Sequence, residues 1–281
     1  LLLGCLLYVS VSLNDAPVIG ILTVPSEYTN IFPRENYSYF DASYVKFLEA
    51  GGARVVPIQY DLPQQNLTQL LNKLNGALFT GGGVPILNPD GSLNQFGQAM
   101  QTIINYVFES KKKGGYFPLW GTCEGFQMIA VLVSQNYSIM VNASGGLGVS
   151  KNIYYYPNAL QTRMLNNLPS YLVSHTQTSN LTYYHHRYTP DPVSWKENPY
   201  LAGNLTPLAY TLDASNNPYV ALYEGKDVPL YGSQFHPEIV WFNTCKCTNQ
   251  NATRSFEAIQ FAQYLADFFV SETRKNNNSF P

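Results

Sequence analysis

Residues 116–133 read YFPLWGTCEGFQMIAVLV, two apolar runs joined by a short stretch of small and polar residues. The first run has the composition of a buried β-strand, and the second that of a buried helix. Gly121 and Gly125 bracket the junction and permit a sharp change of backbone direction. The stretch therefore predicts a strand, a tight turn and a helix, with Cys123 in the turn. Cys123 is then either a small buried structural residue or a side chain that another group must reach.

The same alternation of strand and helix extends on both sides of this stretch. It is typical of α/β proteins in which a mostly parallel sheet is covered by helices on both faces. We expect one domain over residues 14–274, with a less regular, tyrosine-rich part at 140–225. Strands are predicted at 17–24, 53–60, 76–83, 217–225 and 228–238, and helices at 38–52, 65–75, 97–113 and 255–275.

Composition narrows the functional class. The 281 residues are 45% hydrophobic and 12% charged, with a formal net charge of −2. A chain without a basic patch is not expected to bind nucleic acid. Apart from the N-terminus, no stretch is long and apolar enough to cross a membrane.

The two ends of the chain are predicted to lie outside the folded domain. Residues 1–13 have the apolar run and the small residues of a partial signal peptide, although a buried first strand is the alternative. Residues 275–281 are predicted to be a flexible tail. Sequons for N-glycosylation favour a secretory route. They begin at Asn36, Asn66, Asn136, Asn142, Asn180, Asn204, Asn251 and Asn277.

Three strand exits are expected to meet at the carboxyl edge of the sheet, where α/β proteins place their sites. They are the glycine run at 80–83, the turn at Cys123 and the segment QFHPE at 234–238. A Gly-x-Cys-x-Gly turn resembles a nucleophile elbow that exposes its side chain at the apex. The N-terminus of the following helix would favour the thiolate. His236 follows a strand, and Glu238 could orient its ring, so the group predicts acyl transfer.

A developing oxyanion needs hydrogen-bond donors, and two backbone groups are expected to supply them. These are the N–H groups of Gly82 and Glu124. The glycine run could instead be a plain turn or a phosphate-binding turn, but no Lys-Ser/Thr follows it as in a P-loop. Cys245 and Cys247 lie too close for an ordinary loop-closing bridge and lack histidines for a metal site. We therefore expect neither a metal nor an organic cofactor.

Several motifs together resemble class I glutamine amidotransferases and, more closely, the γ-glutamyl hydrolase (folylpolyglutamate hydrolase) family, peptidase family C26. They cover nearly the whole chain after residue 13. The motifs are PVIGIL, YFDASYVKFLEAGGARVVPI, NGALFTGGG, YFPLWGTCEGF, YGSQFHPE and FAQYLADFFVSETRKNN.

This resemblance implies a flavodoxin-like three-layer sandwich and a function. Cys123 would be the nucleophile, His236 the proton shuttle and Glu238 the supporting carboxylate, releasing glutamate from γ-linked tails of folates or antifolates. His186, with a register uncertain by one because of His185, and Tyr39 would be substrate contacts. Relatives are lysosomal, vacuolar or secreted and include homodimers, so the resemblance implies one of these locations and is compatible with a homodimer.

Two departures from the family pattern stand beside the site. Glu124 replaces an apolar residue, and Thr80 stands where proline is common. A carboxylate next to the thiol would disfavour a thiolate and repel an anionic substrate unless it points to solvent. Two alternatives to the hydrolase remain. One is a glutaminase-type amidotransferase module, and the other is a secreted glycoprotein that binds without catalysis.

Overall fold

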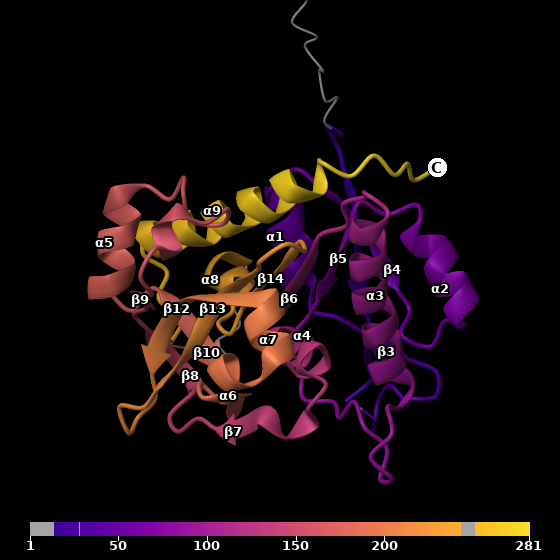
Figure 1. Ribbon diagram of the computed structural model, residues 1–281, viewed down its shortest axis with the longest axis horizontal. Coiled ribbons are helices and arrows are strands. Elements are labelled where there is room, and N and C mark those ends of the chain that lie inside the picture. The colour runs from indigo at the N-terminus through magenta and orange to yellow at the C-terminus, as the bar shows by residue number, and fades with distance from the viewer. Residues whose placement is uncertain (1–13, 28, 243–250) are drawn as a thin grey trace, which may run out of the picture.

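Eight strands form the central sheet of the computed structural model, which describes residues 14–27, 29–242 and 251–281 (Figure 1). The order across the sheet is β4-β1-β5-β6-β14-β13-β12-β9. Neighbours are parallel from β4 to β14 and antiparallel beyond it. The bounds are β1 Val18–Leu22, β4 Arg54–Ile58, β5 Gly76–Phe79, β6 Leu119–Thr122, β9 Tyr154–Tyr155, β12 Leu205–Leu212, β13 Pro218–Gly225 and β14 Leu230–Ser233.

Helices cover both faces of the sheet, which confirms the expected three-layer α/β fold. Alternate residues of a strand point to opposite faces. In β1, Ile19 and Ile21 therefore join the core below α1 and α9, while Val18 and Leu22 join the core below α3 and α4. These helices are α1 Ala42–Ala50, α2 Gln64–Leu71, α3 Gln95–Lys112, α4 Glu124–Ser134 and α9 Phe256–Thr273.

Small strand pairs and short helices lie outside the main sheet. Two antiparallel strand pairs, β8 with β10 and β7 with β11, lie outside the main sheet, as does the pair β2 with β3. Their bounds are β2 Val24–Pro25, β3 Ser38–Tyr39, β7 Met140–Asn142, β8 Leu147–Lys151, β10 Thr182–His185 and β11 Tyr188–Pro190. Short helices complete this part: α5 Ser170–Thr178, α6 Ser194–Glu197, α7 Pro199–Asn204 and α8 Pro237–Phe242.

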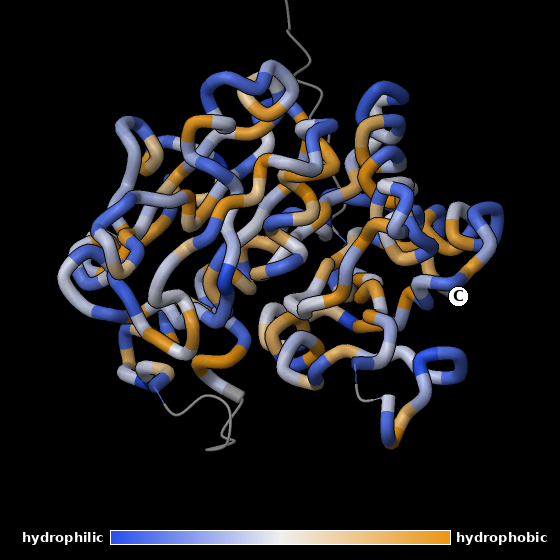
Figure 2. The backbone as a smooth tube through the Cα atoms, turned by 90° about the horizontal axis from the view of Figure 1, so that it is seen from below, coloured by the Kyte–Doolittle hydropathy of each residue, from blue (hydrophilic) through white to orange (hydrophobic). Residues whose placement is uncertain are grey.

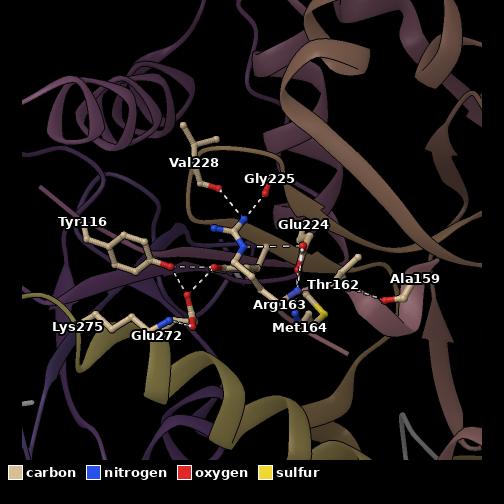
Figure 3. A network of polar contacts seen from close by, with 11 residues as sticks. Tyr116, Ala159, Thr162, Arg163, Met164, Glu224, Gly225, Val228, Glu272 and Lys275 are labelled. Atoms are coloured by element: carbon tan, nitrogen blue, oxygen red, sulfur yellow. Dashed lines mark hydrogen bonds and ion pairs between the residues drawn. The ribbon is translucent and has the colours of Figure 1, made fainter. Parts of the chain in front are cut away.

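A polar network lies at the opposite edge, where β6 and β14 begin (Figure 3). Glu272 near the end of α9 accepts hydrogen bonds from the hydroxyls of Tyr116 and, at 2.7 Å, Tyr231. Arg163 pairs with Glu224 at 3.8 Å and stacks on the ring of Tyr231. Because each buried oxygen has a donor, the network can join α9 to the sheet without leaving an uncompensated charge.

Two residues of the predicted flexible tail at 275–281 are hydrogen-bonded to the domain, and the mobility of the tail stays a prediction. Buried Asn75 donates to the carbonyls of Asn276, at 3.0 Å, and Asn278, at 2.8 Å. Asn276 in turn donates to the carbonyl of Tyr116, at 2.7 Å. The polar composition that predicted mobility also satisfies backbone groups of the domain.

The surface agrees with several other features of the sequence. Hydrophilic segments gather in peripheral loops and helix ends (Figure 2). Seven of the eight sequon asparagines are exposed, and Asn204 is half-buried. No helix within the described ranges is long and apolar enough to span a membrane. The predicted signal segment 1–13, Cys245 and Cys247 lie outside the described residues.

Candidate active site

Cys123 occupies the turn between β6 and α4 with an unusual backbone conformation. Its φ of 53° and ψ of −107° are disfavoured for a residue with a side chain. Both flanking glycines are required by packing, because a Cβ on Gly121 would lie 2.5 Å from the carbonyl carbon of Gly125 and one on Gly125 would meet the carbonyl oxygen of Phe79. The Cys123 N–H donates to Ser233 at 2.9 Å and fixes the turn to β14. Strain held by such packing is typical of reactive sites.

The expected exposure of Cys123 at the apex is wrong, because the residue is only 4% exposed. The segment around His185 lies against it, and the Sγ atom is 3.7 Å from the His185 carbonyl oxygen. His185 ends β10, which is held by its pairing with β8. The sulfur is therefore at a turn but covered by a strand pair from the middle of the chain.

His236 and Glu238 reach the same place from the segment after β14. The Nδ1 atom of His236 lies 2.7 Å from Oε1 of Glu238, and both side chains are buried. The His236 N–H donates to the carbonyl of Tyr183 at 2.8 Å, which fixes the backbone. With Nδ1 bonded to the carboxylate, Nε2 is buried and has no hydrogen-bond partner among the described residues. This nitrogen is therefore available for proton transfer.

The charge state of His236 follows from two opposing effects. Burial lowers the pKa of the imidazole, whereas the charges of Cys123 and Glu238 raise it. The charges prevail, and the pKa lies well above its ordinary value. The ring and the thiol thus interact electrostatically, as expected for a cysteine–histidine pair.

The glycine run lies directly against this pair. A Cβ on Gly81 would sit 2.8 Å from Cε1 of His236 and 3.3 Å from the Cβ of Cys123, so no larger residue fits. The Gly81 N–H donates to the Tyr44 hydroxyl at 2.7 Å. Among the hydrogen bonds of the described residues, none uses the N–H of Gly82 or of Glu124. Glu124 follows Cys123 directly and Gly82 follows Gly81, so both predicted donors belong to the two segments that meet at the thiol.

The Glu124 side chain does not point to solvent. The residue is 8% exposed, and its Oε2 atom lies 2.5 Å from the position of a Cβ on Gly82. Burial raises the pKa of this carboxyl to about 8. Two smaller effects act beside it: the N–H of Val84 lowers the pKa, and the charge of Glu27 raises it. The carboxyl is consequently neutral at neutral and acidic pH, which removes the predicted charge conflict with the thiol.

The two candidate substrate contacts differ in their surroundings. The His186 ring is buried between Tyr184 and Tyr219, and its Nδ1 lies 2.9 Å from the carbonyl of Tyr188. Burial lowers its pKa to about 3, so the ring is neutral, and its Nε2 is buried without a hydrogen-bond partner among the described residues. The neighbouring His185 is exposed and supplies the carbonyl beside the thiol. Both substrate contacts stay predictions.

Tyr39 lies at the outer end of the glycine run. Its hydroxyl donates to Glu27 at 2.8 Å, and Oε1 of Glu27 would lie 3.2 Å from a Cβ on Gly83. Tyr39 is thus near the approach to the site, separated from Cys123 by the glycines.

Two residues that build the site were not identified from sequence. Tyr44 accepts the Gly81 N–H, and Gln127 on α4 donates to the Tyr188 carbonyl at 2.6 Å and to Gln234 at 3.2 Å. Gln127 is one helical turn from Cys123, a spacing that places it on the same helix face. The signal for Gln127 was its polar side chain within the mostly apolar sequence of α4. Tyr44 lies in an ordinary amphipathic helix that carries no such signal.

The site joins a thiol, an imidazole held by a carboxylate, and free N–H donors, which suits cysteine-dependent acyl transfer. Within residues 14–27, 29–242 and 251–281, no group of three histidine, cysteine or acidic side chains is arranged for a metal.

Comparison with known proteins places this geometry in a family. The sequence matches γ-glutamyl hydrolase B of Dictyostelium discoideum with 33% identity, over 96% of this chain and 75% of the relative. It matches γ-glutamyl hydrolase of Bos taurus, also with 33% identity, over 94% of this chain and 80% of the relative.

The fold is also found among solved structures. A putative GMP synthase protein of Thermoplasma acidophilum superposes with a TM-score of 0.53 at 16% identity, covering 92% of this chain and 95% of that one. At that identity the likeness concerns the fold alone. Residues 17–238 match the model of the family described as Peptidase C26. Together with the two hydrolase relatives, this match shows that the chain belongs to the peptidase C26 family.

Proposed function

We propose that this protein is a γ-glutamyl hydrolase that cleaves the γ-glutamyl amide bonds of folyl poly-γ-glutamates and releases glutamate. One observation carries the proposal: Cys123, in a strained turn, lies beside an imidazole whose pKa is raised and whose other nitrogen is bound to Glu238. The names of the relatives supply the bond type, and the sequence resemblance supplies the folate class.

The reaction proceeds in two acyl-transfer steps. The Cys123 thiolate attacks the γ-amide carbonyl carbon, and the negative charge that develops on its oxygen is met by the N–H groups of Gly82 and Glu124. His236 gives its proton to the departing amine, and the C–N bond breaks to leave a γ-glutamyl thioester. The departing amine is the α-amino group of the released glutamate or γ-glutamyl chain. His236 then takes a proton from water, which attacks the thioester and releases the shortened folyl chain and the thiolate. Glu238 holds the ring in the required orientation.

Substrate access needs a movement near the thiol. Because the segment at His185 covers the sulfur, the γ-glutamyl group can reach it only after that segment shifts. Catalytic sites that close around a substrate commonly behave in this way.

Mass-spectrometric product analysis of a synthetic penta-γ-glutamate conjugate tests the proposal. The wild-type protein should release glutamate or shorter γ-glutamyl chains, and Cys123→Ala should not. Equal release by the two proteins would remove the proposed chemistry. Ammonia release from free glutamine without cleavage of the conjugate would instead indicate a glutaminase.

Selective labelling separates the enzyme from a protein that only binds. A thiol-directed glutamine analogue should modify Cys123 in the native protein, and a binding protein should not be labelled selectively there. We further propose that the protein follows the secretory route to a lysosome, a vacuole or the extracellular space, supported by its exposed sequons. Glycosidase treatment of protein from its native source should then lower the apparent mass.

A further inference from the structure

The buried side chain of Glu124 lies against the glycine run. Its Oε2 atom occupies the space beside Gly82, and its carboxyl also lies near the N–H of Val84. Oε2 is buried and has no hydrogen-bond partner among the described residues. A Cβ at position 82 would lie 2.5 Å from this oxygen, so a larger residue there would require the Glu124 carboxyl to shift. The Glu124 side chain therefore packs directly against the turn at Gly82.

The buried position requires the neutral form of the carboxyl. The N-terminus of a helix favours a nearby anion, and the N–H of Val84 lowers the pKa of this carboxyl. Burial disfavours the charged form, and this effect is the larger one. Burial accordingly dominates and raises the pKa of Glu124 to about 8.

We propose that Glu124 is a positioning residue whose carboxyl packs against the Gly82 turn and holds it at the distance from Cys123 that the oxyanion requires, and whose ionisation would place a negative charge beside that oxyanion. This inference rests on the proposed function. It assigns a role to Glu124, the first residue of α4, whose side chain acts through the turn rather than on the substrate.

The charged and titratable groups around Glu124 come from four segments. Glu27, in the loop after β2, acts directly on its pKa. Cys123 precedes it in the chain. Across Gly81 lie the hydroxyl of Tyr44 on α1 and the ring of His236 before α8. Ionised Glu124 would add a negative charge between Glu27 and the thiol, which disfavours the negatively charged transition state.

Three variants test the proposal by steady-state kinetics on the penta-γ-glutamate conjugate between pH 4.5 and 9.5. Glu124→Gln keeps the shape of the neutral acid but cannot ionise. It should keep most of kcat, and its activity should persist to higher pH than that of the wild type. Glu124→Ala should lose kcat by about 10²-fold with little change in KM, the effect expected of a misplaced oxyanion donor.

The third variant tests the contact between residue 82 and the Glu124 carboxyl. Gly82→Ala keeps the backbone N–H but sets a methyl group against Oε2, so it should lower kcat in the wild-type background. The same substitution combined with Glu124→Ala should cost less, because the oxygen is gone. Unfolding midpoints in urea at pH 5 confirm that the variants compared are folded.

Two outcomes would overturn the inference while leaving the proposed function intact. One is a wild-type pH profile that superposes on that of Glu124→Gln, and the other is undiminished kcat in Glu124→Ala. Failure of the wild-type protein itself to cleave the conjugate would instead contradict the proposed function.

Discussion

At the scale of single residues, His236 is governed by the balance between burial and its two charged neighbours. Burial alone would lower the pKa of the ring, and the opposing effects of Cys123 and Glu238 raise it. Removing one neighbour should therefore shift the balance in a known direction. A protonated imidazole beside a thiolate is also the state in which the nucleophile and the acid for the leaving group are both ready.

We predict that Cys123→Ala and Cys123→Ser lower the pKa of His236, because the desolvation that opposes the charge remains while the sulfur's charge is lost. NMR titration of the imidazole nitrogens measures this directly. The serine variant controls for the volume of the side chain, so both variants should show a similar fall. An unchanged His236 titration in both would show that the sulfur does not set the charge of the ring.

Glu124 should give the protein a stability that falls as pH rises. Its pKa is raised in the folded state from 4.5 to about 8, so the folded protein binds a proton that the unfolded chain releases between these values. Stability is then highest near pH 4.5, decreases above it and levels off beyond about pH 8. Urea unfolding should show that Glu124→Gln is stabilised relative to the wild type at pH 8.5 more than at pH 5. Equal differences at the two pH values would contradict a buried neutral acid.

Sequence reasoning identified Cys123, His236 and Glu238, and the structure brings all three together. The prediction was possible because each follows a strand whose apolar run is easily recognised. The burial of Cys123 was not predictable, since the covering segment around His185 approaches from about 60 residues away in the chain. Local patterns carry no information about such a contact.

At the scale of elements, the parallel strands and long helices were predictable because each is a continuous apolar or amphipathic run. The pairs β8 with β10 and β7 with β11 were not. These strands are three to five residues long, and their partners lie far along the chain. β12 contains Pro207 and a register shift, features that weaken a strand pattern. The missed elements are those that need non-local partners to form.

Asn75 connects three elements, and its removal should destabilise the protein. Its Oδ1 accepts the N–H of Val18 at 2.7 Å, and its amide donates to the carbonyls of Asn276 and Asn278. Asn75→Ala leaves these buried groups without partners, which typically costs about 1–3 kcal/mol. Urea unfolding at pH 7 measures the loss. Exposed Asn277→Ala is the matched control and should change the unfolding free energy little; equal effects of the two substitutions would refute the role of Asn75.

At the scale of the whole molecule, the two ends of the strands in the sheet have different roles. The edge where β6 and β14 begin carries the network of Glu272, Arg163 and Glu224, in which the polar groups are paired (Figure 3). The edge where the same strands end carries Cys123 and His236, with buried polar atoms such as Nε2 of His236 unpaired among the described residues. Paired buried groups stabilise a fold, whereas unpaired ones at a site are held by the surrounding packing.

Because β10 covers Cys123, access of reagents to the thiol depends on opening of the β8–β10 pair. Iodoacetamide should modify Cys123 far more slowly in the native protein than in the urea-unfolded chain, and a bulky maleimide should be slower still. Buried Thr182 donates to the Lys151 carbonyl at 2.8 Å across this pair. Because this substitution also removes the Asn180 sequon, the proteins are compared after removal of N-glycans. Thr182→Ala should then speed labelling, because it lowers the free energy of local opening.

Thr178→Ala serves as the matched control, since the Thr178 hydroxyl bonds within α5, to Ser174, and not across the pair. Quantifying the tryptic peptide that contains Cys123 by mass spectrometry separates its labelling from that of other cysteines. If native and unfolded protein were labelled at equal rates, the strand pair could not be a barrier. If Thr182→Ala and Thr178→Ala changed the rate equally, the opening would have to occur elsewhere, because β8 and β10 would then contribute nothing specific to it.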